Sequence, residues 1–441
     1  MAPSSPIHRR RFLRQTSAAA LSCPFVLRAQ KPSSLVRLAS IGCSRNAKGG
    51  PGRGSTIAAG FAALSNVEVA AVCDVDERNL APVAKEVADK SGGKSPRTER
   101  DFRRLLEDKQ IDAVTIATPD HWHTPVALLA IDAGKHVYVE KPCCHNPQEG
   151  EWLVAAARKH NKLVQHGTQR RSWPALREAI DRLRAGEIGR VLSAKSYYFN
   201  ARPSIGRGKE MPPPGWLDWS LWQGPAPERP YRDNYLHYHW HWYWHWGTGE
   251  LGNNGVHMID VCRWGLGVDY ARRVTSAGDK LRFDDDQETP DTNVVTFDFG
   301  KSLSPDARSI TWENRSWSAK TPNDPKADCV FFGEKGSLHV NGGAYAIFDL
   351  EGKEIAKGSG SAGDEVHFQN FLDAIRGSAK LNAEIEEGYK SALLTHLGNI
   401  AWRTTGAVAV DPKTGRLSPG QIEAQKLWGR EYRPGWAPKV S

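Results

Sequence analysis

Long apolar runs are missing from this chain of 441 residues. A helix that crosses a bilayer needs about 20 consecutive, mostly apolar residues, and no stretch of the sequence approaches that length. We therefore expect no membrane span. Hydrophobic residues still make up 39% of the chain, enough for a sizeable core, and the length suits two ordinary domains.

A basic stripe of the kind that binds nucleic acid is also missing. The formal net charge is +9, but residues 1–29 contain five arginines and no acidic residue, so more than half of this charge lies in the N-terminal segment. The remainder of the chain is only mildly basic. We expect no nucleic-acid partner.

Cysteine pairs at metal-binding spacing are absent, because the seven cysteines include no CxxC pair and no Cys/His finger pattern. Cys43, Cys73 and Cys262 lie in apolar contexts and are predicted to be buried thiols. Cys143 and Cys144 are neighbours, and adjacent cysteines rarely form a comfortable disulfide. We expect no metal site.

The N-terminal segment reads HRRRFLRQTSAAALSCPFVLRAQ. Adjacent arginines followed by Phe12 and Leu13, and then by a short run of small apolar residues, are typical of a twin-arginine export signal. We predict a signal peptide over residues 1–29 and a protein that is periplasmic or otherwise exported.

Apolar runs and helical segments alternate through the first third of the chain. The β-rich runs are residues 35–42, 67–76, 111–119 and 135–142, and the segments between them have helical patterns. Near-continuous apolar strands alternating with helices indicate a parallel sheet that is covered on both faces. Residues 35–160 are therefore predicted to form a doubly wound, Rossmann-type α/β domain.

The pattern changes in residues 161–420. Short strand-like segments separated by turn residues, such as 191–201 and 293–300, are flanked by a few helical segments. They predict a C-terminal α+β domain built on a largely antiparallel sheet. Residues 202–230 form a long proline-rich connection, and residues 421–441 are predicted to be a C-terminal tail.

A glycine-rich turn, SIGCSRNAKGGPGRGST, follows the first predicted strand. Gly42, Gly50, Gly52 and Gly54 would let backbone N–H groups approach a pyrophosphate at the N-terminus of the next helix, although the spacing is not a regular GxGxxG. Asp74 closes the second strand, where a carboxylate accepts hydrogen bonds from ribose hydroxyls and repels a 2′-phosphate. These features predict NAD as the cofactor.

The segment VYVEKP ends a predicted strand in Glu140, Lys141 and Pro142. An open parallel sheet binds its ligands at this carboxyl edge. Because burying an ammonium group is costly, a lysine at this edge is rarely structural. Lys141 is therefore a candidate donor to a substrate hydroxyl and to developing oxyanion charge.

Several segments together resemble those of the Gfo/Idh/MocA oxidoreductases. They are TPDHWH (118–123), EKP (140–142), DWSLWQGPAP (218–227), GNNGVHMIDVCRWGLG (252–267), DDDQETPDT (284–292), FFGEKGSL (331–338) and the helical segments within 367–403. The resemblance spans about residues 35–420 and is greatest to exported members. It implies a Rossmann domain that binds NAD(P) and, in residues 161–420, a C-terminal domain with an open, largely antiparallel sheet for substrate binding and oligomerisation. The implied substrates are sugars or cyclitols. The implied assembly is a homo-oligomer, a dimer or tetramer, whose subunits pair through the open sheet.

The resemblance also implies a catalytic set. In that family it is the lysine of EKP with an aspartate and a histidine four positions apart. The lysine corresponds to Lys141 and the histidine to His257, whereas Asn253 stands at the aspartate position. An amide cannot take a proton, so His257 is left as the general base, with a pKa expected to suit neutral pH.

Further residues are expected to contact the ligands because they follow predicted strands. The cofactor candidates are Thr118, Pro119, His121, His123 and Glu140, and the substrate candidates are Gln169 and Arg170. For several of them an ordinary hydrogen bond within a loop is an equally good explanation.

Histidine and tryptophan nearly alternate in HYHWHWYWHW, residues 237–246. If this segment is extended, its histidines share one face and its tryptophans the other. A metal site would lack a carboxylate or cysteine at ordinary spacing, so aromatic contact with a sugar is the better functional interpretation. Trp240, His241 and Trp242 are the candidate substrate contacts, and packing of the tryptophans in the core is the alternative.

These observations predict an NAD-dependent oxidoreductase that acts on a hydroxyl of a sugar, glycoside or cyclitol and transfers hydride to a tightly bound nicotinamide. Two alternatives stay open. The first is a redox-neutral, NAD-dependent glycoside hydrolase that works through a keto-sugar. The second is a non-catalytic sugar-binding protein on the same scaffold, for which Asn253 is the best argument.

Overall fold

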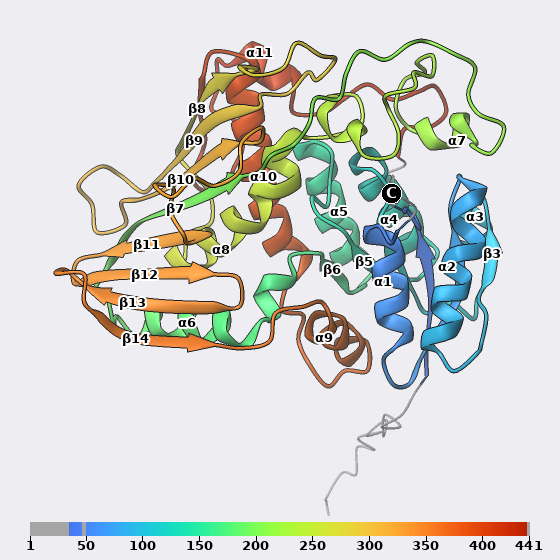
Figure 1. Ribbon diagram of the computed structural model, residues 1–441, viewed down its shortest axis with the longest axis horizontal. Coiled ribbons are helices and arrows are strands. Elements are labelled where there is room, and N and C mark those ends of the chain that lie inside the picture. Colours follow the sequence, from blue (N-terminus) through green and yellow to red (C-terminus); the bar gives the residue numbers. More distant parts are fainter. Residues whose placement is uncertain (1–34, 46–49, 439–441) are drawn as a thin grey trace, which may run out of the picture. The chain divides into compact units, whose positions relative to one another are not determined.

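The structure is a computed structural model that describes residues 35–45 and 50–438, which form two β-sheets with flanking helices (Figure 1). The predicted signal peptide, residues 1–29, lies outside the described residues. Within the described ranges, no helix is long and apolar enough to cross a membrane.

The first sheet is parallel, in the order β3-β2-β1-β4-β5-β6. Its strands are β1 (Val36–Ile41), β2 (Val67–Cys73), β3 (Arg97–Glu99), β4 (Ala113–Ile116), β5 (His136–Val139) and β6 (Val164–His166). The connecting helices are α1 (Arg53–Ala62), α2 (Glu77–Lys90), α3 (Phe102–Leu106), α4 (Asp120–Asp132) and α5 (Pro147–Lys159). The predicted Rossmann-type domain is confirmed.

Both faces of this sheet are buried, which explains its continuous apolar strands. Leu38 of β1 packs in a cluster with residues of α1 and α2, whereas Ile41 packs with residues of α3, α4 and α5. All of β4 is buried. Side-chain caps begin three of the helices, because Asp76 accepts from the N–H of Arg78 at α2, Asp101 from the N–H of Arg103 at α3 and Asn146 from the N–H of Glu149 at α5.

The second sheet has the order β14-β13-β12-β11-β7-β10-β9-β8-β15 and is antiparallel except where β7 pairs with β10. Its strands are β7 (Val191–Phe199), β8 (Arg273–Asp279), β9 (Thr292–Phe299), β10 (Arg308–Arg315), β11 (Cys329–Gly333), β12 (Gly336–Asn341), β13 (Ala344–Asp349), β14 (Glu354–Ser359) and β15 (Ala407–Ala409). This mostly antiparallel sheet confirms the predicted fold class of the second half.

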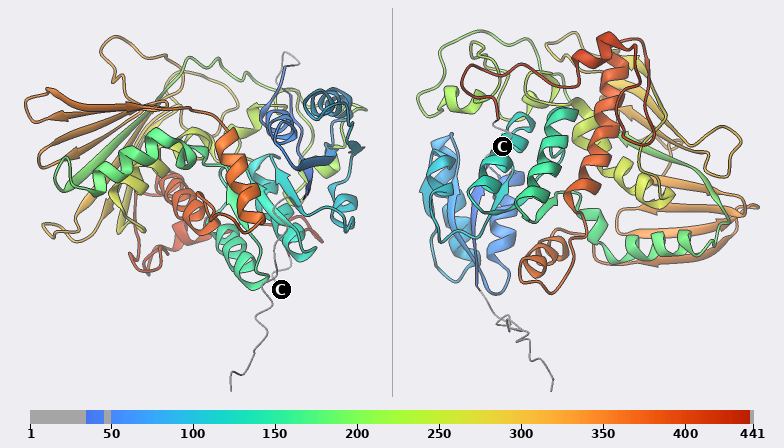
Figure 2. Two further views of the ribbon diagram at one scale, coloured as in Figure 1. Left: turned by 90° about the horizontal axis from the view of Figure 1, so that it is seen from below. Right: turned by 180° about the vertical axis from the view of Figure 1, so that it is seen from behind.

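Helices cover one face of the second sheet. They are α6 (Pro174–Arg184), α8 (Val256–Leu266) and α10 (Ile385–Arg403), and they contact the strands from the same side (Figure 2). In the described part of the chain, the opposite face carries no helix.

Two later segments pack against the first domain. Helix α9 (Glu365–Ile375) places Phe368 against Phe61 of α1, with ring centroids 4.4 Å apart. Beyond α11 (Ile422–Lys426), Arg430 forms an ion pair of 2.6 Å with the fully buried Glu149 of α5. The first domain is thus completed by residues from the end of the chain.

The histidine- and tryptophan-rich segment is not extended, so its histidines and tryptophans do not share two opposite faces as they would in a strand. Its middle forms a 3₁₀ turn, η2 (His239–Trp242), preceded by the short helix α7 (Trp219–Gln223) and followed by η3 (Leu251–Gly255), a π-helical turn. Trp246, which is fully buried, packs against Trp219 and Trp222 at centroid distances of 5.8 and 5.2 Å. Most of these aromatic rings form a core of their own.

Candidate active site

A cavity of about 660 Å³ opens at the carboxyl edge of the parallel sheet and is bounded by residues 237–241 on another side. Many of the predicted site residues line it. They are Gly42, Gly52, Asp74, Thr118, Pro119, His123, Glu140, Lys141, Gln169, Trp240, His241, Asn253 and His257. The structure therefore brings both halves of the predicted site to one cavity.

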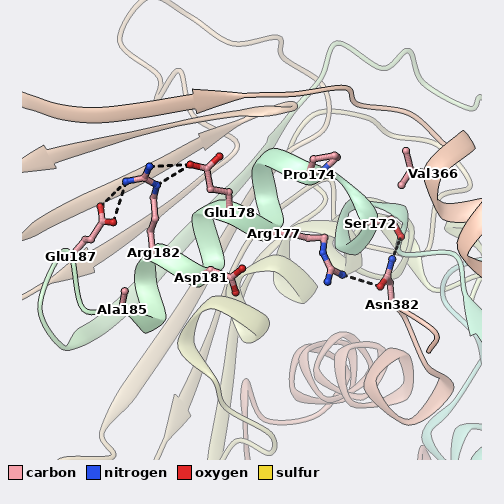
Figure 3. A pocket seen from close by; sticks show the side chains of 10 residues that line it. All are labelled: Ser172, Pro174, Arg177, Glu178, Asp181, Arg182, Ala185, Glu187, Val366 and Asn382. Carbon is pink, nitrogen blue, oxygen red and sulfur yellow. Dashed lines mark hydrogen bonds and ion pairs between the residues drawn. The ribbon is translucent and has the colours of Figure 1, made fainter. Parts of the chain in front are cut away.

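A second hollow of about 810 Å³ runs along the surface of α6 (Figure 3). Arg182 lies between Glu178 and Glu187 at 2.9 and 3.0 Å, and Arg177 donates to Asn382 at 2.8 Å. These cations already have partners and the hollow is open to solvent. The cavity at the sheet edge is the better candidate for the active site.

The glycine-rich turn allows α1 to begin directly beside the end of β1. Gly42 has φ +81°, and a side chain there would lie 2.7 Å from the backbone of Ala117. A Cβ on Gly54 would lie 1.8 Å from the carbonyl oxygen of Gly42. Gly54 therefore serves this close packing and is not among the cavity-lining residues, and neither is Gly50, which follows the undescribed residues 46–49.

Asp74 is held rigidly at the end of β2. Its Oδ2 accepts from the N–H of Cys43 and its Oδ1 from the N–H of Asp76, each at 2.8 Å. Burial raises the pKa of Asp74, although these two N–H groups favour the ionised form. Each oxygen keeps a lone pair for a further donor, so the carboxylate fits the ribose hydroxyls of NAD.

Arg53, which the sequence reasoning did not single out, connects the turn to the EKP segment. Its guanidinium contacts Glu140 at 2.8 Å and Asp364 at 2.5 Å, and it also lines the cavity. Burial opposes the ionisation of Glu140, but the charges of Arg53 and Lys141 outweigh this effect and lower the pKa of Glu140. Glu140 is therefore ionised, pairs with Arg53 and acts on Lys141 through its charge.

Lys141 is fixed by the residue that replaces the family's aspartate. Its Nζ donates to Oδ1 of Asn253 at 2.7 Å and to the backbone oxygen of Asn253 at 2.9 Å. Burial lowers the pKa of Lys141, and the neighbouring Glu140 and Asp120 only partly offset that effect. The amine therefore lies in the cavity with a proton that is easier to remove than that of an exposed lysine.

His257 begins the first turn of α8 and faces the same cavity as Lys141. Burial is the main cause that lowers the pKa of His257 well below its usual value, and the charge of Lys141 is the second. The expectation of a pKa suited to neutral pH is therefore not met. The imidazole is neutral at pH 7 and can accept a hydrogen bond, but it is a weak base.

Several buried polar atoms around the cavity have no hydrogen-bond partner among residues 35–45 and 50–438. They are Thr118 Oγ1, Gln169 Oε1, Asn253 Nδ2 and His257 Nδ1. A buried donor or acceptor without a partner is costly, so these atoms are suited to a bound ligand.

Besides Gly50 and Gly54, three predicted contacts lie outside the cavity lining. The Nε2 of His121 is 3.0 Å from the carbonyl oxygen of Trp222, Arg170 pairs with Asp328 at 3.4 Å, and Trp242 is only 3% exposed. His121 and His123 also lie inside α4, which begins at Asp120, rather than in a loop. His123 itself lines the cavity, and its ring nitrogens contact the carbonyl oxygens of Pro142 and Thr118 at 2.6 and 2.8 Å.

Asp120 is the main cavity residue that the sequence reasoning missed. It is 2% exposed, and its Oδ2 accepts from the hydroxyl of Thr248 at 2.6 Å. Burial raises the pKa of Asp120 to about 7, against the lowering effects of Thr248 and Lys141. The sequence feature that could have identified Asp120 is its position directly after Thr118 and Pro119 in the TPDHWH segment.

Known protein families match both halves of the chain. Residues 39–168 match the oxidoreductase family with an NAD-binding Rossmann fold, and residues 197–301 match the C-terminal alpha/beta domain of the same oxidoreductase family. The WlbA dehydrogenase from Bordetella pertussis, solved with NADH and UDP-GlcNAcA, superposes with a TM-score of 0.63, covering 86% of this chain and 98% of that one. Its sequence identity is 18%, so this likeness concerns the fold.

Some of the curated relatives match this chain over nearly their whole length, and others match it over only a part. Inositol 2-dehydrogenase 2 of Saccharopolyspora erythraea is 26% identical over 81% of this chain and 92% of that enzyme. Levoglucosan dehydrogenase of Pseudarthrobacter phenanthrenivorans is 29% identical over 38% of this chain, and the match spans only 36% of that enzyme. With the NAD-compatible turn, Asp74 and the cavity already described, the chain belongs to the Gfo/Idh/MocA family of NAD-binding oxidoreductases.

Proposed function

We propose that this protein oxidises a hydroxyl group of a sugar, glycoside or cyclitol with a tightly bound NAD. The observation that supports this best is the position of Lys141, whose amine lies in the same cavity as Asp74 and is oriented there by Asn253. A nucleotide-binding sheet edge and a proton-transferring amine thus share one enclosed space.

The residues that would hold NAD are distributed along the cavity. Asp74 would bind the adenosine ribose, and Gly52 and Arg53 at the start of α1 would face the pyrophosphate. Thr118 and His123 lie further along, toward Lys141, where the nicotinamide half would be bound. When bound, NAD accepts the hydride that the substrate carbon loses.

The protein residues would orient the hydroxyl and manage its proton. The Nζ of Lys141 would bind the substrate oxygen and stabilise its developing charge. The neutral imidazole of His257 would accept a hydrogen bond from a substrate hydroxyl, and the unpartnered Nδ2 of Asn253 would donate one. Neither side chain needs to be charged for these contacts.

The substrate class rests on the chemical character of this end of the cavity. Gln169, Asn253 and His257 supply neutral donors and acceptors, which match hydroxyl groups. Trp240 and His241 stack with ring centroids 3.6 Å apart at the cavity wall and offer an aromatic surface to the apolar face of a sugar ring. The similarity to an inositol dehydrogenase and a levoglucosan dehydrogenase agrees with this class.

Absorbance of reduced nicotinamide tests the proposal directly. The purified chain is mixed with NAD and, separately, with myo-inositol, levoglucosan, D-glucose and a nitrophenyl glycoside. A lasting rise in absorbance with one of the polyols is expected. Release of nitrophenol without a net change in absorbance would instead identify a redox-neutral glycosidase, and stabilisation by the sugar without either change would identify a sugar-binding protein.

We also propose export through the twin-arginine pathway and a homo-oligomer. Export rests on the RRRFL motif of residues 9–13 and is checked by fractionating cells that produce the full chain. Assembly rests on the uncovered face of the second sheet, where the exposed apolar side chains Val294 and Phe332 lie.

A further inference from the structure

Three carboxylates line the active-site cavity, and two of them already have strong partners. Asp74 accepts two backbone N–H groups, and Glu140 is 2.8 Å from the guanidinium of Arg53. Asp120, like Asp74, forms no ion pair within 4 Å with any cation of the described residues, and of these two it is Asp120 on which the charge of Lys141 acts. Its charge is therefore free to change during a reaction at Lys141.

Asp120 is nevertheless held in a fixed position. It is the first residue of α4, and the hydroxyl of Thr248 donates to its Oδ2 at 2.6 Å. The backbone oxygen of Thr248 in turn accepts from the side-chain amide of Asn399 in α10 at 2.8 Å. A buried side chain held by a residue that is itself anchored to α10 is suited to a defined role.

The other candidates for accepting a proton are weak. Asn253, bound to Lys141 at 2.7 Å, is an amide and cannot be protonated under these conditions. His257 is destabilised as an imidazolium by burial and by Lys141, which lowers its pKa well below the usual value. Lys141 can pass a proton on only if another group receives it.

We propose that Asp120 is the group that receives the substrate's proton in this site. The proposal rests on the oxidation proposed above. The substrate O–H bond breaks and its proton moves to Nζ of Lys141, while the ammonium gives one of its own protons, through one intervening water, to the Asp120 carboxylate, because the two groups lie more than 4 Å apart. The C–H electron pair leaves as hydride to the nicotinamide, and the carbon–oxygen double bond forms.

The surroundings of Asp120 agree with this role. The titratable groups that face it are Lys141 and Cys144, both from the segment after β5, and the charges of Glu140 and Glu250 act on Lys141. Burial raises the pKa of Asp120 to about 7, so the group can gain and lose a proton near neutral pH. A proton acceptor is most effective when its pKa lies near the working pH.

Asp120→Asn tests the proposal, because the amide keeps an acceptor for Thr248 but cannot take a proton. We expect kcat with the polyol that the wild type oxidises to fall by about 100-fold or more, with little change in KM or in the dissociation constant for NAD. The acidic limb of the pH–rate profile, assigned to ionisation of Asp120, should disappear. Asp181→Asn, in the exposed part of α6, is the matched control and should leave all of these unchanged.

A rescue variant separates proton transfer from structural support. Because Asn253 lies directly on Nζ of Lys141, Asn253→Asp in the Asp120→Asn background places a carboxylate within reach of the same amine. Partial recovery of kcat is expected. A structural role for Asp120 would give no recovery.

Infrared spectroscopy of the ligand-free protein supplies a readout that needs no turnover. In the wild type, the carbonyl band of the protonated Asp120 carboxyl group should disappear as the pH rises through about 7. The same band should be absent from Asp120→Asn. Wild-type turnover with an unaffected Asp120→Asn variant would overturn this proposal alone. Failure of the wild type to reduce NAD with any polyol would remove the proposed oxidation and this step together.

Discussion

At the scale of single residues, the buried carboxylate of Asp120 should reduce the stability of the folded protein. Burial raises its pKa to about 7 in the folded state, above the ordinary value of 3.8. The folded state therefore holds this proton more tightly than the unfolded state, and stability is lost as the pH rises from about 4 through about 7. Asp120→Asn should remove this loss, which amounts to a few kcal/mol at most (~1.4 per pKa unit).

The melting temperatures of the wild type and the variant, followed from mildly acidic to mildly alkaline pH, check this expectation. The melting temperature of the variant should increase relative to that of the wild type as the pH rises, and it should remain higher above neutral pH. A difference that does not depend on pH would show that Asp120 has an ordinary pKa in the folded protein.

Asp74 should determine the choice between NAD and NADP. Its two oxygens already accept N–H groups at 2.8 Å, so the carboxylate is held where a 2′-phosphate would meet a like charge. Asp74→Asn should weaken NAD binding by about tenfold, because a hydrogen bond to a charged group is lost. Binding of NADP should weaken less or improve.

Titration of the ligand-free protein with each nucleotide measures both constants. Asp89→Asn, an exposed carboxylate in α2 of the same domain, is the control and should change neither. An equal loss for NAD and NADP would mean that Asp74 only supports the loop.

At the scale of secondary-structure elements, the approach of α1 to β1 depends on the absence of a side chain at Gly54. A Cβ there would lie 1.8 Å from the carbonyl oxygen of Gly42, far closer than two such atoms can come. Gly54→Ala should displace the helix N-terminus, lower the melting temperature by several degrees and abolish NAD binding, since overpacking costs about 1–3 kcal/mol or more. Thermal melts and NAD titration measure both effects.

Gly215→Ala is the control for this substitution, because nothing lies within 4 Å of a Cβ at that position. It should melt and bind NAD like the wild type. Normal NAD binding by Gly54→Ala would show that the turn accommodates a side chain and is not the cradle that we infer.

Two neighbouring tryptophans of η2 should behave differently although both are buried. Trp240 lines the cavity, whereas Trp242 is 3% exposed and packs within the aromatic cluster. Leucine at either position should lower the free energy of unfolding by roughly 2–4 kcal/mol, measured by denaturant titration. Only Trp240→Leu should also raise KM for a polyol, and a similar KM for both variants would exclude Trp240 as a substrate contact.

The sequence was sufficient for the elements whose burial is uniform. Strands β1, β2, β4 and β5 are covered on both faces, so their apolar runs are continuous and easily predicted. The conformation of residues 237–246 could not be predicted in this way, because their alternation of period two also fits a strand. Contacts of Trp246 with distant aromatic residues such as Trp222 decide the conformation instead.

The candidate site was predictable to the extent that its residues follow strands. Asp74 and Lys141, which follow β2 and β5, reach the cavity as expected, and so does His257 of α8, which the family resemblance indicated. Asp120 was overlooked because an acid in the first turn of a helix is common and needs no special explanation. Its significance depends on Thr248, which is 128 positions away in the chain and contacts it only in the folded structure.

At the scale of the whole molecule, the uncovered face of the second sheet should hold two subunits together. Val294 of β9 and Phe332 of β11 are each 43% exposed on that face, and the half-buried Tyr197 and Phe199 lie on β7, one of the two strands between them. Exposed apolar groups gathered on one surface usually mark an interaction site. Pairing of two such faces would bury them.

The double substitution Val294→Lys and Phe332→Lys should therefore give a monomer, because two like-charged lysines from each subunit would meet in the interface. Light scattering during gel filtration measures the mass. Leu129→Lys, a comparably exposed position on α4, is the control and should leave the oligomer intact. Since neither substituted residue lines the active-site cavity, the monomer should still bind NAD, and loss of NAD binding would show that the sheet face and the site depend on each other.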